Sequence, residues 1–184
     1  MKKYILTTIS FIVVALIILF IAKDSKLFSS FKAFFLPEPT YALFEEQKVL
    51  TDYDWSLIGP TAKAKNLIIK ENTIVIVKVW SSESEDSKID LASFNELYED
   101  YKTKVEFVFV TRDEQAPARN FLSKNKYLFP LYFSMSTPPK PLNISFAPQT
   151  YVINRKGRIV VDFKGSANWN SKKFREMLDG LLKQ

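Results

Sequence analysis

Seven polar residues, Ser81–Ser87, stand between an apolar run and a stretch with helical periodicity. Four of them are serines and three are acids. A serine hydroxyl can act as a nucleophile when a base activates it, and clustered carboxylates can hold a hard metal ion such as Mg²⁺. Acids at the start of a helix also complement the helix dipole. Ser82 and Glu85 have the spacing of a capping box, so helix initiation explains the same residues without any reaction.

The composition excludes most catalytic classes. The chain of 184 residues contains no cysteine and no histidine, so it can form no disulfide, thiolate nucleophile, imidazole base or imidazole metal ligand. We predict no cofactor and no metal site. The formal net charge is +6, but the basic residues are spread along the chain and form no stripe interleaved with aromatic residues. We therefore expect no nucleic-acid partner.

Residues 1–26 have the pattern of a transmembrane anchor. The segment Tyr4–Ala22 contains 19 uncharged, mostly apolar residues, and as a helix it would span roughly 28 Å, close to the thickness of the bilayer core. Phe20–Ala22 is a poor signal-peptidase site, which favours an anchor that is not cleaved. Lysines flank both ends of the segment, so the positive-inside rule barely chooses an orientation.

Residues 27–50 are interpreted as a juxtamembrane segment and linker. Apolar residues recur there at helical spacing, which predicts a short helix in the membrane interface; they are Leu27, Phe28, Phe31, Phe34 and Phe35. Packing of this helix on the globular domain is the alternative. Pro37–Pro39 ends the helix and predicts a stiff linker.

Residues 51–184 have the pattern of one α/β domain. A hairpin is predicted over 54–59 and 66–70, and nearly continuous apolar runs predict buried strands over 72–80 and 105–110. Helices are predicted over 85–102, 115–125 and 170–182, the last after caps at Asn168 and Asn170. A second hairpin is predicted to turn at 155–157. Strand, helix, strand, helix, hairpin and helix is the order of elements in the thioredoxin fold, with a central mixed sheet flanked by helices.

Three segments carry a more specific resemblance. Val77–Thr111, the Ala147–Thr150 turn before YVINRKGRIV, and Gly165–Ser171 resemble the membrane-anchored thioredoxin-like proteins of the TlpA/ResA type, especially their Bacteroidetes members. The resemblance covers about residue 52 to the end of the chain. It implies a thiol–disulfide oxidoreductase ancestry and a domain on the periplasmic side of the inner membrane, held by a single-pass anchor.

The resemblance also locates the redox positions. In active members a Cys-x-x-Cys begins four residues after the strand's tryptophan, so Trp80 places the two cysteine positions at Ser84 and Ser87. A working dithiol needs a thiolate stabilised by the helix N-terminus. A serine hydroxyl stays protonated and cannot exchange with a disulfide. This implies a pseudoenzyme with a degenerate site.

Two neighbours of this site have counterparts in the family. Pro148 matches the family's cis-proline, and the backbone before it pairs with bound substrate in active members. Conservation of the proline for folding alone is the alternative. Lys78 lies where active members carry a neutral or acidic residue beneath the redox centre. We predict that Lys78 either pairs with Glu83 or Asp86, or extends from the strand end towards water.

Three functions remain open at this point. The first is binding of a peptide or protein partner in the former substrate groove; its predicted residues are Trp80, Glu83, Glu85, Asp86, Phe146, Ala147 and Pro148. An exposed apolar surface around Trp80, Phe146 and Pro148 would favour it, whereas a polar, filled groove would favour a structural role in an envelope assembly. The third is a different enzyme that uses Ser84, Ser87 and the neighbouring acids.

Overall fold

The computed structural model describes residues 12–13, 32, 34–59, 64–66 and 72–184. Among these residues no helix has the length and apolar content that a membrane span requires. The predicted anchor, Tyr4–Ala22, lies outside the described residues except for Ile12 and Val13. Most of the predicted juxtamembrane helix lies outside them too.

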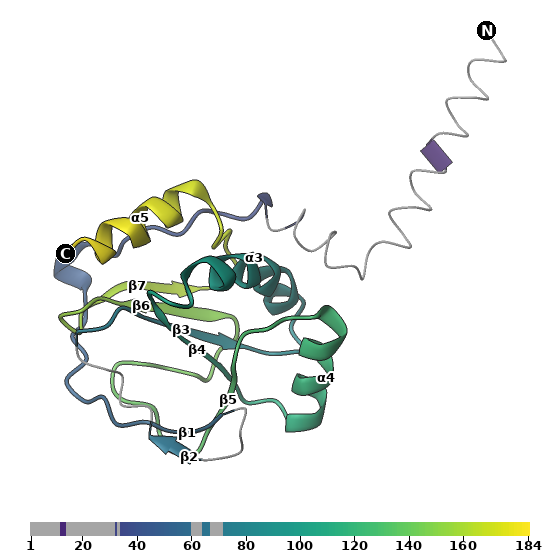
Figure 1. The fold of residues 1–184 in the computed structure, drawn as a ribbon, viewed down its shortest axis with the longest axis horizontal. Helices are drawn as coiled ribbons and strands as arrows, with labels where there is room; N and C mark the ends of the chain where they lie inside the picture. Colours follow the sequence, from purple (N-terminus) through teal and green to yellow (C-terminus); the bar gives the residue numbers. More distant parts are fainter. Residues whose placement is uncertain (1–11, 14–31, 33, 60–63, 67–71) are drawn as a thin grey trace, which may run out of the picture.

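A seven-stranded mixed sheet forms the centre of the domain (Figure 1), with the order β2-β1-β5-β4-β3-β6-β7. The strands are β1 (Ser56–Ile58), β2 (Ala64–Asn66), β3 (Val75–Trp80), β4 (Glu106–Thr111), β5 (Leu131–Ser134), β6 (Gln149–Ile153) and β7 (Ile159–Lys164). β3, β4 and β5 run parallel, and the other pairings are antiparallel. The predicted thioredoxin-like α/β class is therefore confirmed, and the N-terminal hairpin is present as β1 and β2.

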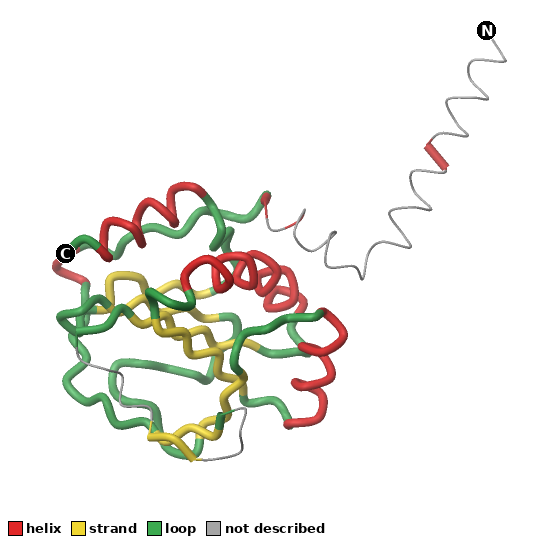
Figure 2. The backbone as a smooth tube through the Cα atoms, viewed as in Figure 1, coloured by secondary structure: helices red, strands yellow, loops and turns green. Residues whose placement is uncertain are grey.

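Three helices follow the strands in the predicted order: α3 (Glu85–Tyr101), α4 (Gln115–Asn125) and α5 (Lys172–Leu182). Figure 2 shows them above the sheet and to its right. Their buried side chains share one core with Ile74, Ile76 and Trp80 of the β3 segment. The alternate residues Val75, Val77 and Val79 enter a second core on the other face. β3 is buried on both faces, which is why its sequence is almost uniformly apolar.

Several predicted ends are shifted. The strand predicted from residue 72 begins at Val75, because Asn72 adopts a left-handed turn with φ 65°. β2 begins at Ala64, before the predicted start at residue 66. α5 begins at Lys172 because Ser171, rather than Asn168 or Asn170, is its N-cap and accepts a hydrogen bond from the Phe174 amide.

The segment from Pro37 to Leu50 packs on the domain. The Pro37 carbonyl accepts a hydrogen bond from the Asn168 amide at 2.9 Å, and the Leu50 amide donates to the Gly157 carbonyl at 2.8 Å. Between them the chain bonds β7 through Ala42 to Val160 and through Ile159 to Lys48. This part of the predicted linker is therefore an added edge of the sheet.

Candidate functional site

The serines at the two redox positions close the first turn of α3. Ser84 is the N-cap, and its hydroxyl accepts a hydrogen bond from the Ser87 amide at 3.2 Å. Ser87 is fully buried, and its hydroxyl accepts from the Ser81 amide at 3.2 Å. The Ser84 hydroxyl therefore satisfies an amide that the helix start would otherwise leave unpaired, and the Ser87 hydroxyl satisfies an amide of the loop before the helix. The prediction of a capping box between Ser82 and Glu85 is wrong, because the cap lies two residues later.

Asp113 binds the loop that precedes this turn. Its carboxylate accepts hydrogen bonds from the Ser81 hydroxyl at 2.8 Å, and from the Ser82 amide and hydroxyl at 2.5 and 2.7 Å. Asp113 follows β4, which lies parallel to β3, so the carboxyl ends of the two strands bring these residues together. The sequence analysis missed Asp113. Its position just after the second buried strand is the signal that could have found it.

We expect Asp113→Ala to lower the free energy of unfolding by about 1–3 kcal/mol, because three donors lose a charged acceptor. Glu114→Ala is the matched control, since it removes the same charge from an exposed neighbour whose side chain makes no capping bond. Urea unfolding measures the difference. Equal stability of the two variants would contradict this role for Asp113.

A buried ion pair lies beneath the start of α3. The Lys78 ammonium donates to the Asp90 carboxylate of α3 and to the Thr150 hydroxyl of β6 at 3.1 Å. Both charged side chains are fully buried. The other Asp90 oxygen accepts from the Ala167 amide at 3.3 Å. The pair therefore joins α3, two strands and the loop before α5.

Burial dominates the ionisation of this pair. It lowers the pKa of Lys78, opposed by the charge and hydrogen bond of Asp90. It also raises the pKa of Asp90 to about 6, opposed by Lys78 and by the Ala167 amide. For each group, the free-energy cost of removing the charge from water exceeds the stabilisation that its partner provides.

Both predictions for Lys78 are wrong. It pairs with neither Glu83 nor Asp86, and it does not extend to water. The sequence analysis missed Asp90, although one signal was available. A lysine within an apolar strand and an aspartate on the apolar side of the next helix are both unusual, and a buried ion pair between them accounts for both.

Four of the seven predicted groove residues line two separate hollows: Trp80 and Ala147 line the first, and Glu83 and Glu85 line the second. The first has a volume of about 330 Å³ and is lined by Val79, Trp80, Ser81, Arg112, Asp113, Ile144, Ser145 and Ala147. Trp80 offers little surface there, since it is 1% exposed and packs against Phe121. Pro148 is buried, and the Ala147–Pro148 bond is cis.

We refer to Phe146 and Ala147 as the rim, because Ala147 lines this hollow and Phe146 is its exposed neighbour in the chain. Phe146 is 42% exposed, and the Lys164 ammonium lies 4.0 Å from the centre of its ring. Within the described part of the chain, no backbone hydrogen bond joins Phe146 or Ala147 to another residue. The rim thus presents a short length of unpaired main chain.

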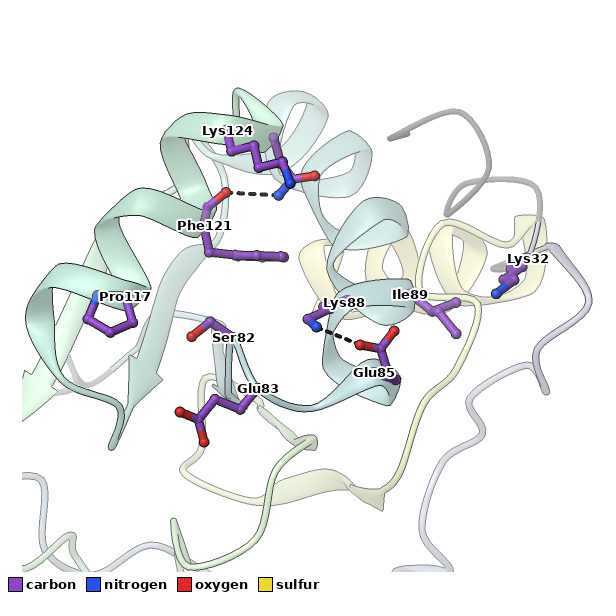
Figure 3. A pocket seen from close by; sticks show the side chains of 10 residues that line it. Lys32, Ser82, Glu83, Glu85, Lys88, Ile89, Pro117, Phe121 and Lys124 are labelled. Carbon is purple, nitrogen blue, oxygen red and sulfur yellow. Dashed lines mark hydrogen bonds and ion pairs between the residues drawn. The ribbon is translucent and has the colours of Figure 1, made fainter. Parts of the chain in front are cut away.

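The acids of the predicted groove lie at a different place. Figure 3 shows the second hollow, of about 390 Å³, between the start of α3 and α4, with Glu83 and Glu85 on its wall. Lys88 donates to Glu85 at 2.5 Å, and this hydrogen bond lowers the pKa of the Glu85 carboxyl. Asp86 is exposed, and its carbonyl accepts from the Ser166 hydroxyl. The described residues contain no cluster of side chains suited to hold a metal ion.

Comparisons with known proteins define the class of fold. No family model matches the chain, and no curated protein matches it. Solved structures do match. A protein of Chlorobium tepidum assigned as thiol:disulfide interchange protein DsbE is 19% identical, with a TM-score of 0.57, over 80% of this chain and 99% of that one.

Two further solved structures agree. StoA of Bacillus subtilis is 21% identical, with a TM-score of 0.54, over 69% of this chain and 94% of its own. A secreted thiol-disulfide isomerase of Corynebacterium glutamicum is 15% identical, with a TM-score of 0.56, over 78% and 91%. At these identities the likeness establishes the fold. The chain has the thioredoxin-like fold of thiol–disulfide oxidoreductases and contains no cysteine.

Proposed function

We propose that this chain is a redox-inactive, membrane-tethered thioredoxin-like domain that binds an extended segment of a partner protein at the Phe146–Ala147 rim. The unpaired backbone of these two residues beside the 330 Å³ hollow carries the proposal. Exposed main-chain donors and acceptors at the end of a strand can pair with an added chain, and the neighbouring hollow can select its side chains.

Loss of redox activity follows from the chemistry of the chain. Thiol–disulfide exchange requires a thiolate, and the chain has none. The hydroxyls of Ser84 and Ser87 are engaged with backbone amides of the helix start, which supports a structural use of these positions. The solved structures with oxidoreductase descriptions share the fold, and the proposed function keeps their scaffold without their reaction.

The walls of the hollow indicate the chemistry of the segment. Ile144 and Ala147 of the wall are half-buried and apolar. Arg112 of the wall and Lys164, over the Phe146 ring, are exposed cations. The Asp113 carboxylate of the wall already accepts hydrogen bonds from Ser81 and Ser82. We propose a segment with a small apolar side chain for the hollow and an acidic residue next to it. The apolar run Tyr4–Ala22 supports the membrane tether, and the resemblance to TlpA/ResA-type proteins supports a position outside the cytoplasm.

Ala147→Arg tests the proposal. The substitution places a bulky cation at the rim, where Ala147 is half-buried at the edge of the second core. We therefore expect loss of peptide binding, with a melting temperature lowered only slightly. Peptides selected from a random display library on the wild-type chain serve as probes, and titration calorimetry measures their affinity. Asn120→Arg, at an exposed position of α4, adds the same side chain elsewhere and should bind as the wild type does.

A structural role in an envelope assembly is the second candidate. The burial of Trp80 and Pro148 favours it, because two of the three residues expected to form an apolar surface are enclosed. Unchanged peptide affinity in a well-folded Ala147→Arg chain, or failure to select any peptide, would replace the binding proposal with this one.

A further inference from the structure

Exposed apolar side chains are concentrated at the beginning of the described domain. From Lys32 onward, nine large apolar side chains of the described residues are exposed, and six of these lie between Phe34 and Val49. The six are Phe34, Phe35, Tyr41, Leu43, Phe44 and Val49. Single exposed apolar residues need no explanation, but such a concentration on one segment marks a contact surface.

The most exposed of them form two pairs at opposite ends of α5. Phe34 and Phe35 are 74% and 71% exposed, and Phe34 lies with Asn170 and Lys172 at the start of the helix. Leu43 and Phe44 are 66% and 64% exposed, and Phe44 lies with Leu181 and Gln184 at its end. The 11-residue helix α5 is about 16 Å long, so the two pairs are separated by roughly this distance.

The segment between the pairs runs beside α5 and is fixed to it (Figure 1). The Asn168 amide donates to the Pro37 carbonyl at 2.9 Å, and the Tyr41 hydroxyl donates to the Met177 carbonyl at 3.1 Å. Arg158 lies 4.7 Å from the centre of the Phe44 ring and orients it. The segment that joins the two pairs is therefore held along α5.

The segment that precedes these apolar pairs in the sequence indicates that a bilayer covers them. The predicted anchor ends at Ala22, twelve residues before Phe34, so the two residues are at most about 40 Å apart even in a fully extended chain. A bilayer held that close meets the domain at a high effective concentration, and weak apolar contacts then suffice for binding. Phenylalanine and leucine side chains enter the boundary between headgroups and acyl chains.

We infer that the Phe34–Phe35 and Leu43–Phe44 pairs insert into the surface of the bilayer that holds the anchor, and fix the orientation of the domain. This inference rests on the membrane tether in the proposed function. Charge has a small part in it, because exposed acids such as Glu45, Glu46 and Glu176 offset the lysines of the same surface. The contact should therefore persist at high salt.

The Leu43–Phe44 pair lies apart from the proposed binding rim. Arg158 and Phe44 lie at the β6–β7 turn, whereas Ala147 and Pro148 precede the opposite end of β6. Five strand residues separate them by about 17 Å. Contact of Leu43 and Phe44 with the bilayer therefore does not require contact at the rim.

Nitroxide labelling of the full chain tests the contact. The chain contains no cysteine, so Leu43→Cys and, separately, Leu128→Cys each give one labelling site. The two positions are matched in exposure, at 66% and 69%, and Leu128 lies beside β5. The variants are reconstituted into phosphatidylethanolamine–phosphatidylglycerol vesicles and floated, and collisions of the label with oxygen and with a water-soluble nickel complex are measured.

We expect the ratio of oxygen to nickel collisions to be several-fold higher at position 43 than at position 128, with and without added salt. Equal ratios in floated vesicles would overturn the contact and leave the tether intact. Dipolar broadening between labels at position 43 would overturn it too, by showing that a second copy covers the surface. A chain that does not float would overturn both the tether and the contact, whereas the Ala147→Arg experiment tests the rim independently.

Discussion

Asp90→Ala is expected to lower the free energy of unfolding by about 3–5 kcal/mol, because it leaves Lys78 buried without its counter-charge. Lys78 and Asp90 are both fully buried, and Asp90 also accepts from the Ala167 amide. The loss should be largest in acid and smaller in alkali, since a buried lysine without a partner sheds its proton as the pH rises. Denaturant unfolding from pH 5 to pH 9 measures both effects.

The double variant Lys78→Met/Asp90→Leu is the control. It removes both charges and fills similar volumes, so its stability should lie close to that of the wild type. The pair also gives a pH dependence with a definite sign. The pKa of Asp90 is about 6 in the folded chain against 3.8 unfolded, so its contribution to stability is fully present below about pH 4 and is lost as the pH rises through 6. A single Asp90→Ala variant as stable as the double variant would contradict the buried ion pair.

The wild-type chain is expected to reduce no disulfide, and Ser84→Cys/Ser87→Cys is expected to form one. The two positions lie three residues apart on the first turn of α3, and the Ser87 amide already reaches the Ser84 side chain at 3.2 Å. Position 87 is fully buried and position 84 is half-buried, so the thiol at position 84 should be the one that reacts. Insulin reduction and thiol counting under oxidising conditions measure these outcomes.

The acids of the first turn should keep that thiol slow. Glu85 and Asp86 follow it directly and oppose formation of a thiolate, although the helix N-terminus favours it. Adding Glu85→Gln and Asp86→Asn should speed alkylation at neutral pH, by about threefold for each unit by which the thiol pKa falls, because the larger thiolate fraction is partly offset by lower nucleophilicity. Reduction of insulin by the pure wild-type chain, or a double variant that stays reduced in oxidant, would refute this account.

Local pattern was sufficient for much of the fold. The bounds of α4 match the prediction, and the burial of β3 follows from its apolar run. Caps were less predictable, because Ser82 and Ser84 are both good cap residues. The choice between them depends on Asp113, which binds Ser82 from the loop after β4.

The site depends still more on distant contacts. Lys78 and Asp90 lie on different elements. Each is an unexplained charge in an apolar segment until the packing of α3 on the sheet brings the two together. The predicted groove joined the acids that follow Trp80 to Phe146–Pro148, because the family resemblance places both segments beside the redox centre. Glu85 and Ala147 instead line different hollows, because the loop Ser81–Ser84 turns the acids towards α4.

The pairing of Pro37–Leu50 with the domain has a practical consequence. Ala42, Lys48 and Leu50 bond the outer side of β7 and its turn, so this segment shields what would otherwise be an open strand edge. A shortened chain that begins at residue 51 would bare those donors and acceptors and invite edge-to-edge aggregation. Any soluble version of the domain should therefore retain the residues from Pro37 onward.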